Sequence, residues 1–415
     1  MTLAIPHVAT ALSGGAAQER SPAGEQLLSG RHIPALDAIR GLAILMVTYY
    51  RFGGGSPEYA SAGDGLPLHE IGSRGVELFF VLSGFLITGI LYDSKDQPHF
   101  FRNFYARRTL RIFPLYYGVL LLGLVLLPAV SSVAASWYVE AREQQAWLWF
   151  YGANVLQSWR GAWSLGWFNH FWSLAIEEHY YLLWPMVVFF LSRRQALVAC
   201  GALFALSAGS RVAWVLLGGN DVAPEVFTLF RLDAIVLGSA LALLVLGPLG
   251  LRGLVKPAFA GVALSLPVLI GVSLLDRRIF TIPESFWAIF FGAAIILVLA
   301  AREGGMIERA GRSRVLRFFG KYSYGMYVFQ SLLIPVMAGV VTATGLASSL
   351  GSPLLGQLAY LLIMFAATTG MALLSWHAYE KHFLKLKSRF EARRSAATQT
   401  KLSPALSAVS ASVPG

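Results

Sequence analysis

The chain has 415 residues, of which 56% are hydrophobic and 13% charged, and its mean hydropathy is +0.60. A soluble protein of this length carries about a quarter charged residues, so the composition indicates a polytopic membrane protein. The formal net charge of +11 does not indicate nucleic-acid binding, because the basic residues lie between apolar runs rather than in one patch. The single cysteine, Cys200, excludes an intramolecular disulfide and a cysteine-based metal site, and we predict no metal site.

The two ends of the chain differ in composition from the part between them. Residues 1–30 are rich in Ala, Gly and Ser and have no continuous apolar core behind a basic start, so we predict a disordered tail and no cleavable signal peptide. Residues 386–415 are basic and then rich in Ser and Ala, which predicts a second disordered tail. No long linker interrupts residues 31–385, which we predict to form one membrane domain.

Apolar segments of about 20 residues, the length needed to cross the hydrocarbon core, recur along this domain. The loops after the second, fourth, sixth and eighth segments are rich in Lys and Arg, whereas those after the fifth and ninth contain neither. Arg277 and Arg278, after the seventh segment, break this trend. The pattern predicts an all-α transmembrane bundle of about ten spans with both termini in the cytoplasm. The predicted spans are 36–55, 75–92, 113–132, 171–192, 196–217, 227–247, 257–275, 284–301, 323–342 and 355–377.

The first predicted span contains three charged residues, Asp37, Arg40 and Arg51. Eleven positions separate the two arginines, which places them on one helical face, roughly 16 Å apart along the axis. A charge inside a membrane is costly, so such residues are found mainly where they line a cavity or have a partner. The alternative is that both side chains snorkel to opposite surfaces.

The second and third predicted spans add further polar groups. Ser83 and Gly84 lie in the middle of the second span, where small residues allow close helix approach, and Glu77 lies near its outer end, where an interfacial position is expected. Arg107, Arg108 and Arg111 lie at helical spacing just before the third span. The planar fork of arginine suits phosphate recognition, although topology determination and contact with anionic lipid would explain these residues equally well.

The fourth predicted span contains consecutive ionisable residues, Glu177, Glu178 and His179. Successive helical residues point about 100° apart, so at most two of them can face one cavity. Desolvation and like-charge repulsion can make such groups general acids or bases, and the alternative is a structural ion pair with an arginine of span one or three. Later spans contribute Arg231 and Asp233, and the hydroxyls around Tyr324.

In chain order these segments resemble the acyltransferase 3 family, the integral-membrane O-acyltransferases of polysaccharides and other glycoconjugates. The resemblance covers residues 36–385 and implies a multi-pass protein of the cell inner (plasma) membrane. It also implies transfer of an acyl group from acyl-CoA, such as acetyl-CoA, to a hydroxyl of a cell-surface glycan or lipid-linked sugar, with no permanently bound cofactor. The matching blocks are 36–52, 75–88, 107–116 and 172–181, with shorter blocks around Arg231 and Ser323.

The resemblance, together with the chemistry of the side chains, assigns roles. Arg107, Arg108 and Arg111 form a basic rim for the polyanionic donor, and Ser83 and Tyr324 complete the donor-binding set. The catalytic candidates are grouped in two spans. Arg40 is expected to stabilise a phosphate or the thioester oxyanion, and a glutamate or the neutral imidazole to activate the acceptor hydroxyl. The catalytic set is Asp37, Arg40, Arg51, Glu177, Glu178 and His179.

Two residues depart from the family pattern. The family usually has histidine where this chain has Arg51, and again where it has Gln330. Arginine cannot serve as a base because its pKa exceeds ~12. Either His179 or a glutamate replaces the first histidine, or the chain is a catalytically degenerate member that acts as a transporter or binding subunit. A purely structural scaffold would leave the acids of span four unexplained. Acyl-CoA turnover distinguishes these alternatives.

Overall fold

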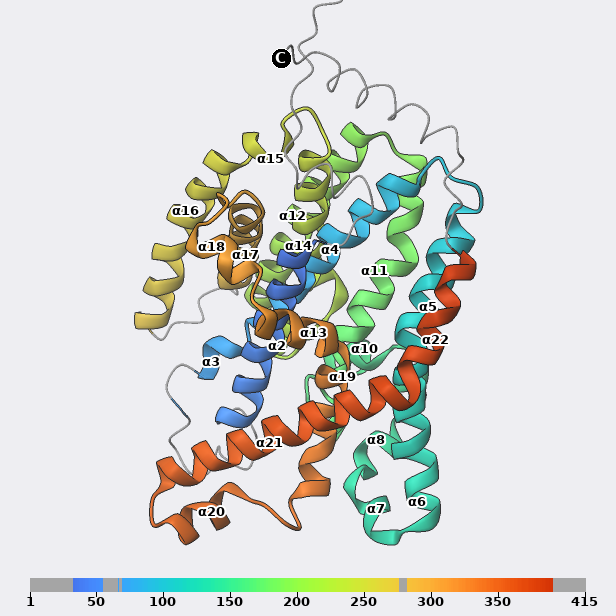
Figure 1. Cartoon of the computed structure of the whole chain (residues 1–415), viewed down its shortest axis with the longest axis vertical. Helices are drawn as coiled ribbons and strands as arrows, with labels where there is room; N and C mark the ends of the chain where they lie inside the picture. The colour runs from blue at the N-terminus through green and yellow to red at the C-terminus, as the bar shows by residue number, and fades with distance from the viewer. Residues whose placement is uncertain (1–32, 55–65, 67–68, 276–281, 391–415) are drawn as a thin grey trace, which may run out of the picture.

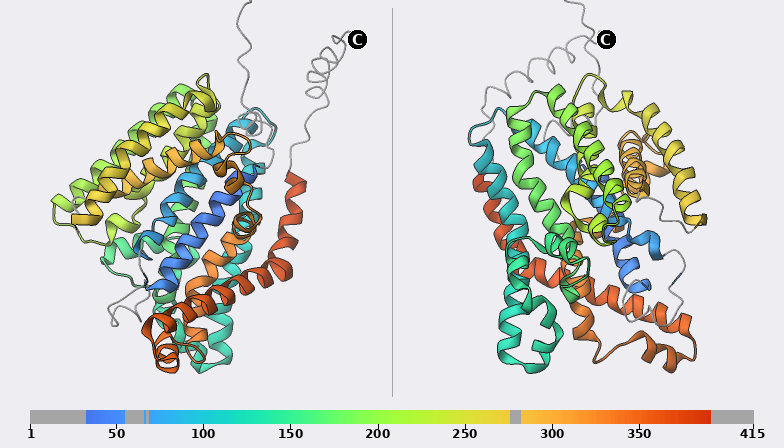
Figure 2. Two further views of the ribbon diagram at one scale, coloured as in Figure 1. Left: turned by 60° about the vertical axis from the view of Figure 1, so that its left-hand side comes forward. Right: turned by 180° about the vertical axis from the view of Figure 1, so that it is seen from behind.

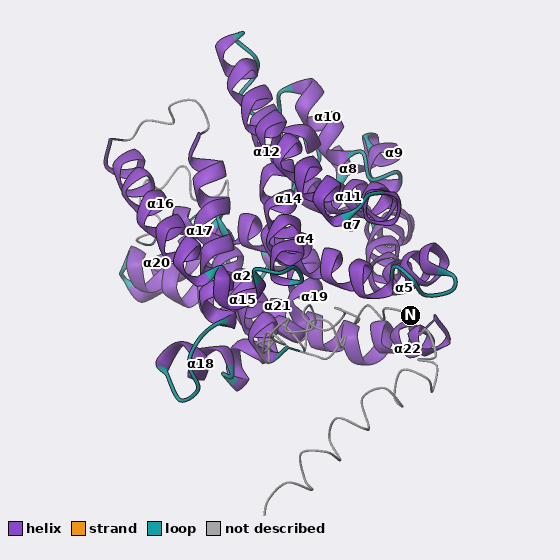
Figure 3. Ribbon diagram, turned by 90° about the horizontal axis from the view of Figure 1, so that it is seen from above, coloured by secondary structure: helices purple, strands orange, loops and turns teal. Residues whose placement is uncertain are grey.

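The computed structural model describes residues 33–54, 66, 69–275 and 282–390, and the described residues form helices and loops without strands (Figure 3). The predicted tails 1–30 and 386–415 lie outside these residues, except that Leu386–Phe390 forms a short 3-10 helix, η5. Arg277 and Arg278 also lie outside them.

Ten long helices correspond to the ten predicted apolar segments within the described part of the chain (Figure 1). Their bounds are α2 Pro34–Gly53, α4 Gly75–Ser94, α5 Phe100–Leu120, α11 Phe171–Phe190, α12 Arg193–Leu216, α14 Thr228–Val245, α16 Val255–Leu275, α17 Ile282–Leu299, α19 Arg314–Met337 and α21 Pro353–Ser375. The short helices are α3 His69–Gly72, α6 Leu127–Val130, α7 Ser132–Trp137, α8 Val139–Glu143, α9 Gln145–Trp149, α10 Ala153–Arg160, η2 Gly166–Phe168, α13 Ala223–Val226, α15 Gly250–Gly253, α18 Met306–Gly311, α20 Ala343–Leu350 and α22 Lys381–Lys385, and π-helical turns lie at Leu121–Leu126 and Trp376–Glu380.

The protein is a multi-pass membrane protein, and six of the described helical segments are long and apolar enough to cross a bilayer. They contain α4, α5, α12, α14, α16 and α21. The other long helices fall short for identifiable reasons: α2 contains three charged residues, α11 two glutamates, and α19 a basic first part, while α17 is a shorter apolar helix. A count of about ten spans therefore remains a prediction.

Two pairs of helices make unusually close contacts through glycine. Gly41 of α2 lies against the backbone of Leu316 in α19, and Gly320 of α19 lies against the carbonyl of Asp37. The second pair packs in the same way: Gly84 of α4 lies against the carbonyl of Ile235 in α14. A Cβ atom at any of these glycines would collide with backbone, so backbone packing fixes where the helices cross.

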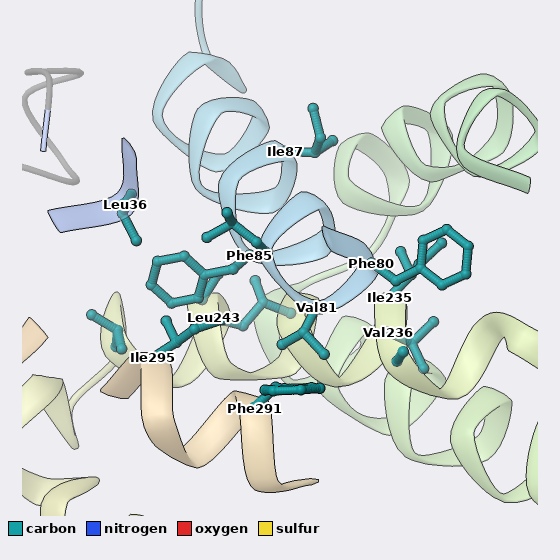
Figure 4. Packing of buried hydrophobic residues seen from close by; sticks show 14 of the residues in the cluster. Leu36, Phe80, Val81, Phe85, Ile87, Ile235, Val236, Leu243, Phe291 and Ile295 are labelled. Atoms are coloured by element: carbon teal, nitrogen blue, oxygen red, sulfur yellow. The ribbon is translucent and has the colours of Figure 1, made fainter. Parts of the chain in front are cut away.

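The main core surrounds α4. Its apolar side chains interdigitate with those of α14 and α17 (Figure 4). The central residues of this cluster are Phe80, Val81 and Phe85 of α4, Ile235, Val236 and Leu243 of α14, and Phe291 and Ile295 of α17.

The helices that matter for the site meet beside this core. The start of α2, the start of α5 and the short helix η5 approach one another, because Arg40, Arg107 and Phe390 line one pocket. Helices α16 and α22 lie at opposite edges of the molecule in Figures 1 and 3 and in the back view of Figure 2. Because Arg40 and Phe390 line the same pocket, the first and last parts of the described chain are neighbours at one side of the bundle.

Candidate active site

A cavity of about 90 Å³ lies between α2, α4, α5, α11 and α19. Its wall combines aromatic and aliphatic side chains with hydroxyls, two carboxylates and three guanidinium groups. The polar lining residues are Arg40, Ser83, Arg108, Arg111, Ser173, Glu177, Glu178, Tyr181, Ser323, Tyr324 and Tyr327. The sequence motifs of four predicted spans and of the basic segment before span three thus converge on one space.

The carboxylates of α11 reach this cavity, whereas the adjacent imidazole does not line it. Glu177 and Glu178 both line the wall, and Oε1 of Glu178 is buried without a hydrogen-bond partner. Arg108 lies within electrostatic range of both carboxylates. The ring of His179 instead lies between the backbone of Tyr151 and the hydroxyl of Thr228, whose Oγ1 is 2.8 Å from Nδ1. The structure therefore places the two glutamates, and not His179, at the cavity.

A second pocket of about 260 Å³ adjoins the cavity and is strongly basic. Arg40, Arg108 and Arg111 line both spaces, and Arg107 and Lys387 line only the second pocket. The spacing of Arg107, Arg108 and Arg111 on α5 brings all three to this pocket. We call these five cations and the space between them the basic pocket.

Lys387 of η5 lies beyond the apolar helix α21 in the chain and lines the basic pocket. Burial, followed by the charges of Arg111, Arg108, Arg107 and Arg40, lowers the pKa of Lys387 to about 7. The described residues that line the pocket include five cations and no Asp or Glu, so its positive charge is not balanced by a lining carboxylate. Such a pocket is suited to a polyanion.

Aromatic hydroxyls position the cavity wall. The hydroxyls of Ser83 and Tyr181 form a hydrogen bond, and the Arg108 guanidinium lies over the Tyr181 ring, 5.1 Å from its centroid. Tyr324 donates to the carbonyl of Ile112 at 2.8 Å, so its hydroxyl is already engaged. Ser83 and Tyr324, predicted as donor-binding residues, are thus part of the wall shared by α4, α5, α11 and α19.

The three charged residues of α2 occupy different places. Arg40 lines both the cavity and the basic pocket, which argues against simple snorkelling. Asp37 lines neither, although it lies within electrostatic range of Arg111. Arg51 also lines neither; its guanidinium lies over the Tyr50 ring, 5.7 Å from the centroid, and its Nε atom is buried without a hydrogen-bond partner.

Glu77 is buried inside the bundle in an ion-pair cluster, which was not predicted from the sequence. Its side chain is only 4% exposed and bonds to Arg231 at 2.6 Å and to Arg74 at 3.3 Å. A second buried pair, Arg211 and Asp233 at 2.8 Å, lies on α12 and α14. In both pairs the acid neutralises the arginine inside the bundle, so these residues serve structure.

Several residues that shape the site did not stand out in the sequence. His170 is 4% exposed, and its Nε2 lies 3.2 Å from the carbonyl of Val328. Tyr327 lines the cavity, bonds to Ser173 and donates to the carbonyl of His170 at 3.1 Å. Lys387 falls in a stretch predicted to be a tail. For Tyr327 and Ser173 the sequence did offer a signal, in the family blocks around Ser323 and at 172–181, whereas nothing singled out His170 or Lys387 as a site residue.

No group of three or more His, Cys, Asp or Glu side chains suited to a metal ion occurs within residues 33–54, 66, 69–275 and 282–390.

Comparison with known proteins decides the family. The sequence profile of the acyltransferase 3 family, described as an acyltransferase domain, matches residues 33–376. The chain belongs to the acyltransferase 3 family. The matched region contains every residue of the cavity and all of the basic pocket except η5.

Two bacterial relatives support this assignment. The chain is 26% identical to O-acetyltransferase OatA of Staphylococcus aureus over 334 residues, which are 75% of this chain and 52% of that protein. It is 27% identical to the provisionally named peptidoglycan O-acetyltransferase YrhL of Bacillus subtilis over 375 residues, 85% of this chain and 55% of that one. The chain thus spans about half the length of these relatives. No solved structure matches it significantly.

Proposed function

We propose that this acyltransferase moves an acyl group, such as acetyl, from acyl-CoA to a hydroxyl of a cell-surface glycan or glycolipid. The single observation that carries the proposal is the direct junction of the basic pocket with the acid-lined cavity. Arg40, Arg108 and Arg111 belong to both spaces, so a ligand with a polyanionic end and a reactive end can occupy both at once.

The donor fits this arrangement by charge. Coenzyme A carries phosphate groups at one end, and arginine forks bind phosphate through paired charge-assisted hydrogen bonds. Phosphates held by Arg107 and Lys387 in the outer part would leave the thioester arm directed toward the cavity. Arg40 and Arg108 then lie where a negative charge on the thioester oxygen would develop.

Glu178 is the base that this geometry supports best. It lines the cavity, and its Oε1 has no hydrogen-bond partner, so the atom is available to a ligand. In the proposed reaction Glu178 takes the proton of the acceptor hydroxyl, whose oxygen bonds to the thioester carbonyl carbon. The C–S bond breaks, and the proton passes from Glu178 to the departing sulfur. The products are an ester and free coenzyme A, so atoms and charges balance.

The proposed orientation places the basic pocket and both termini in the cytoplasm, in the inner (plasma) membrane of the cell. This orientation follows the positive-inside rule, because the pocket collects cations from α2, α5 and η5 at one end of the bundle. It also gives the donor access from the compartment in which acyl-CoA is made.

A second candidate function rests on Arg51, which stands where the family usually has histidine. Without that histidine, the protein could bind donor and acceptor without transferring the group. Purified full-length protein in lipid nanodiscs, given acetyl-CoA and a cell-wall glycan extract, distinguishes the two. We expect release of free thiol together with a gain of one acetyl mass on the glycan. Donor binding without either product would favour the non-catalytic function.

A further inference from the structure

Arg51 and Gln330, the two departures from the family pattern, lie at one level of the fold. Helices α2 and α19 run parallel and touch where Gly41 meets Gly320. Each of the two residues lies ten positions further along its helix, about 15 Å from the contact. The helices are still adjacent there, because Phe52 of α2 packs in one cluster with Leu333 and Ile334 of α19. The two substitutions are therefore neighbours in space.

Buried polar atoms without partners gather at this level. Nε of Arg51, both amide atoms of Gln330, and the hydroxyls of Thr48 and Thr368 make no hydrogen bond within the described part of the chain. Thr48, Gln330 and Thr368 are at most 1% exposed. Thr48 lies one turn before Arg51 on α2, and Thr368 lies one turn after Met364 of α21, which packs in the same cluster as Phe52. We call these four polar residues the Arg51 cluster.

Such a cluster is unusual inside a protein. Most buried polar atoms in native structures are hydrogen-bonded, and each one left unpaired costs about 1–3 kcal/mol. Here several atoms on three helices lack partners together. A polar occupant that bonds to all of them would remove the cost.

Charge indicates what that occupant is. The two fully buried arginines of the described chain, Arg211 and Arg231, each have a carboxylate within 2.8 Å, whereas Arg51 is half-buried with a buried Nε. Arg51 has no ion pair with any carboxylate of the described residues; its titratable neighbours there are Tyr50, Tyr327 and His170. A buried cation needs a compensating negative charge. One arginine balances a single negative charge, which favours a carboxylate over a phosphate dianion.

The position of the Arg51 cluster connects it with the acceptor. Tyr327 lines the cavity and lies within electrostatic range of Arg51, so the cluster adjoins the cavity. The basic pocket lies at the other end of α2, because Arg40 is roughly 16 Å from Arg51 along the helix. The cluster is therefore on the side of the cavity opposite to the proposed donor.

We propose that the Arg51 cluster binds a carboxylate of the acceptor, so that the enzyme acylates an acidic sugar. The guanidinium would bind the carboxylate through two parallel hydrogen bonds, and the Gln330 amide and Thr48 hydroxyl would donate the others. This inference rests on the proposed function, which identifies the bound molecule as the acceptor. The carboxylate site itself can be measured without turnover.

The test measures binding of small sugars to the full chain in nanodiscs, with saturating coenzyme A present to occupy the basic pocket. The probes are methyl glucuronide, methyl glucoside and methyl glucoside 6-phosphate, which differ only at the sixth carbon. We expect the wild type to bind the glucuronide at least tenfold more tightly than either of the others. Equal affinities, or tighter binding of the phosphate, would overturn the proposal.

Three variants test whether Arg51 causes the preference for the carboxylate. Arg51→Gln is expected to abolish the tenfold preference, whereas Arg102→Gln, near the exposed start of α5 and outside both pockets, should keep it. Arg51→His guards against misfolding of the glutamine variant: its imidazole is mostly neutral at pH 8, so the preference should be lost there. A preference that persists in Arg51→His at pH 8 would contradict the proposal.

The same samples test the proposed function separately. Acetyl-CoA binding by the wild type is measured in the absence of sugar and of coenzyme A. A protein that binds the glucuronide through Arg51 but not acetyl-CoA would refute the donor assignment and retain the carboxylate site. A protein that turns over acetyl-CoA but shows no carboxylate preference would retain the donor assignment and refute the carboxylate site.

Discussion

At the scale of single residues, the arginines of this bundle divide by whether a described acid neutralises them. Arg231 and Arg211 are paired with buried carboxylates, so their charge is spent on holding helices together. Arg40, Arg108 and Arg111 have no such ion pair within the described residues and line open space. Only the arginines of the second group are available to balance the charge of a ligand, so we place the donor beside them.

Glu178 provides the sharpest test of the chemistry. Glu178→Gln keeps the shape and burial of the side chain but cannot accept a proton, so we expect acyl transfer to fall at least 100-fold. Donor affinity, measured by acetyl-CoA titration, should change less than threefold. His179→Gln is the matched control on the same helix, because His179 does not line the cavity. If Glu178→Gln kept full transferase activity and His179→Gln lost it, the histidine and not Glu178 would be the base.

The shared arginines should set donor affinity. Replacing Arg108 or Arg111 by glutamine removes a charge-assisted contact, which corresponds to a loss of about tenfold or more in affinity for acetyl-CoA. The loss should be larger at low salt, where screening is weak. Arg102→Gln, on the same helix and exposed, is the control and should bind normally. Unchanged affinity in both test variants at every ionic strength would leave these arginines as topology determinants.

The low pKa of Lys387 predicts that donor affinity depends on pH. Its pKa of about 7 in the free protein lies below the ordinary lysine value, because burial and the neighbouring arginines disfavour the charged form. A bound polyanion would favour the charged form, so binding takes up a proton. The contribution of Lys387 to acetyl-CoA affinity should therefore be complete below pH 7 and be lost as the pH rises from 7 to 9. Lys387→Arg stays charged and should remove most of this decline in a binding titration at several pH values.

At the scale of helices, backbone contacts through glycine fix the crossings that place the site. The α2–α19 contact brings Arg40 beside Ser323 and Tyr324, and the α4–α14 contact supports the helix that carries Ser83. An alanine in a helix is ordinarily more favourable than a glycine by about 1 kcal/mol, so a loss of stability on substitution reports steric conflict.

Gly84 and Gly209 form a matched pair for this test. A Cβ at Gly84 would collide with the Ile235 carbonyl, whereas a Cβ at Gly209 of α12 meets nothing within 4 Å. We expect Gly84→Ala to lower the free energy of unfolding by about 1–3 kcal/mol, as overpacking does, and Gly209→Ala to leave it unchanged or slightly higher. Thermal unfolding in detergent checks both. Equal behaviour of the two variants would contradict the role of the Gly84 contact.

The sequence predicted the long helices well because apolar length is a local property. The predicted spans from 113 and 323 begin inside longer helices, which start at Phe100 and Arg314. Arginines and lysines end an apolar window but do not end a helix, and Ser313 caps α19 by accepting from the amide of Leu316.

The site was predictable only in part, for a related reason. Motif residues could be assigned to one cavity by family resemblance, and Glu177, Glu178, Arg40 and Arg108 do line it. The rotation of each helix about its axis was not available from the sequence. Rotation decides that His179 points to Thr228 and that Glu77 meets Arg231.

At the scale of the whole molecule, the charges are distributed along one direction. The basic pocket lies where α2, α5 and η5 meet, while α20 lies toward the other end of the bundle, near the bottom of Figure 1. The described part of α20 and its flanking loops, from 338 to 352, contains no Lys or Arg. This asymmetry is the structural counterpart of the basic loops in the sequence, and it supports cytoplasmic termini.

Cysteine labelling in intact cells tests this orientation. Cys200 is buried and can be replaced by serine, after which Ser349→Cys on α20 and Arg389→Cys on η5 each introduce one exposed thiol. A membrane-impermeant maleimide should label Ser349→Cys in intact spheroplasts and label Arg389→Cys only after the membrane is opened. The reverse pattern would invert the protein and place the basic pocket outside the cytoplasm. The donor would then have to be a polyanion other than cytoplasmic acyl-CoA, because only the cytoplasm supplies acyl-CoA to this pocket.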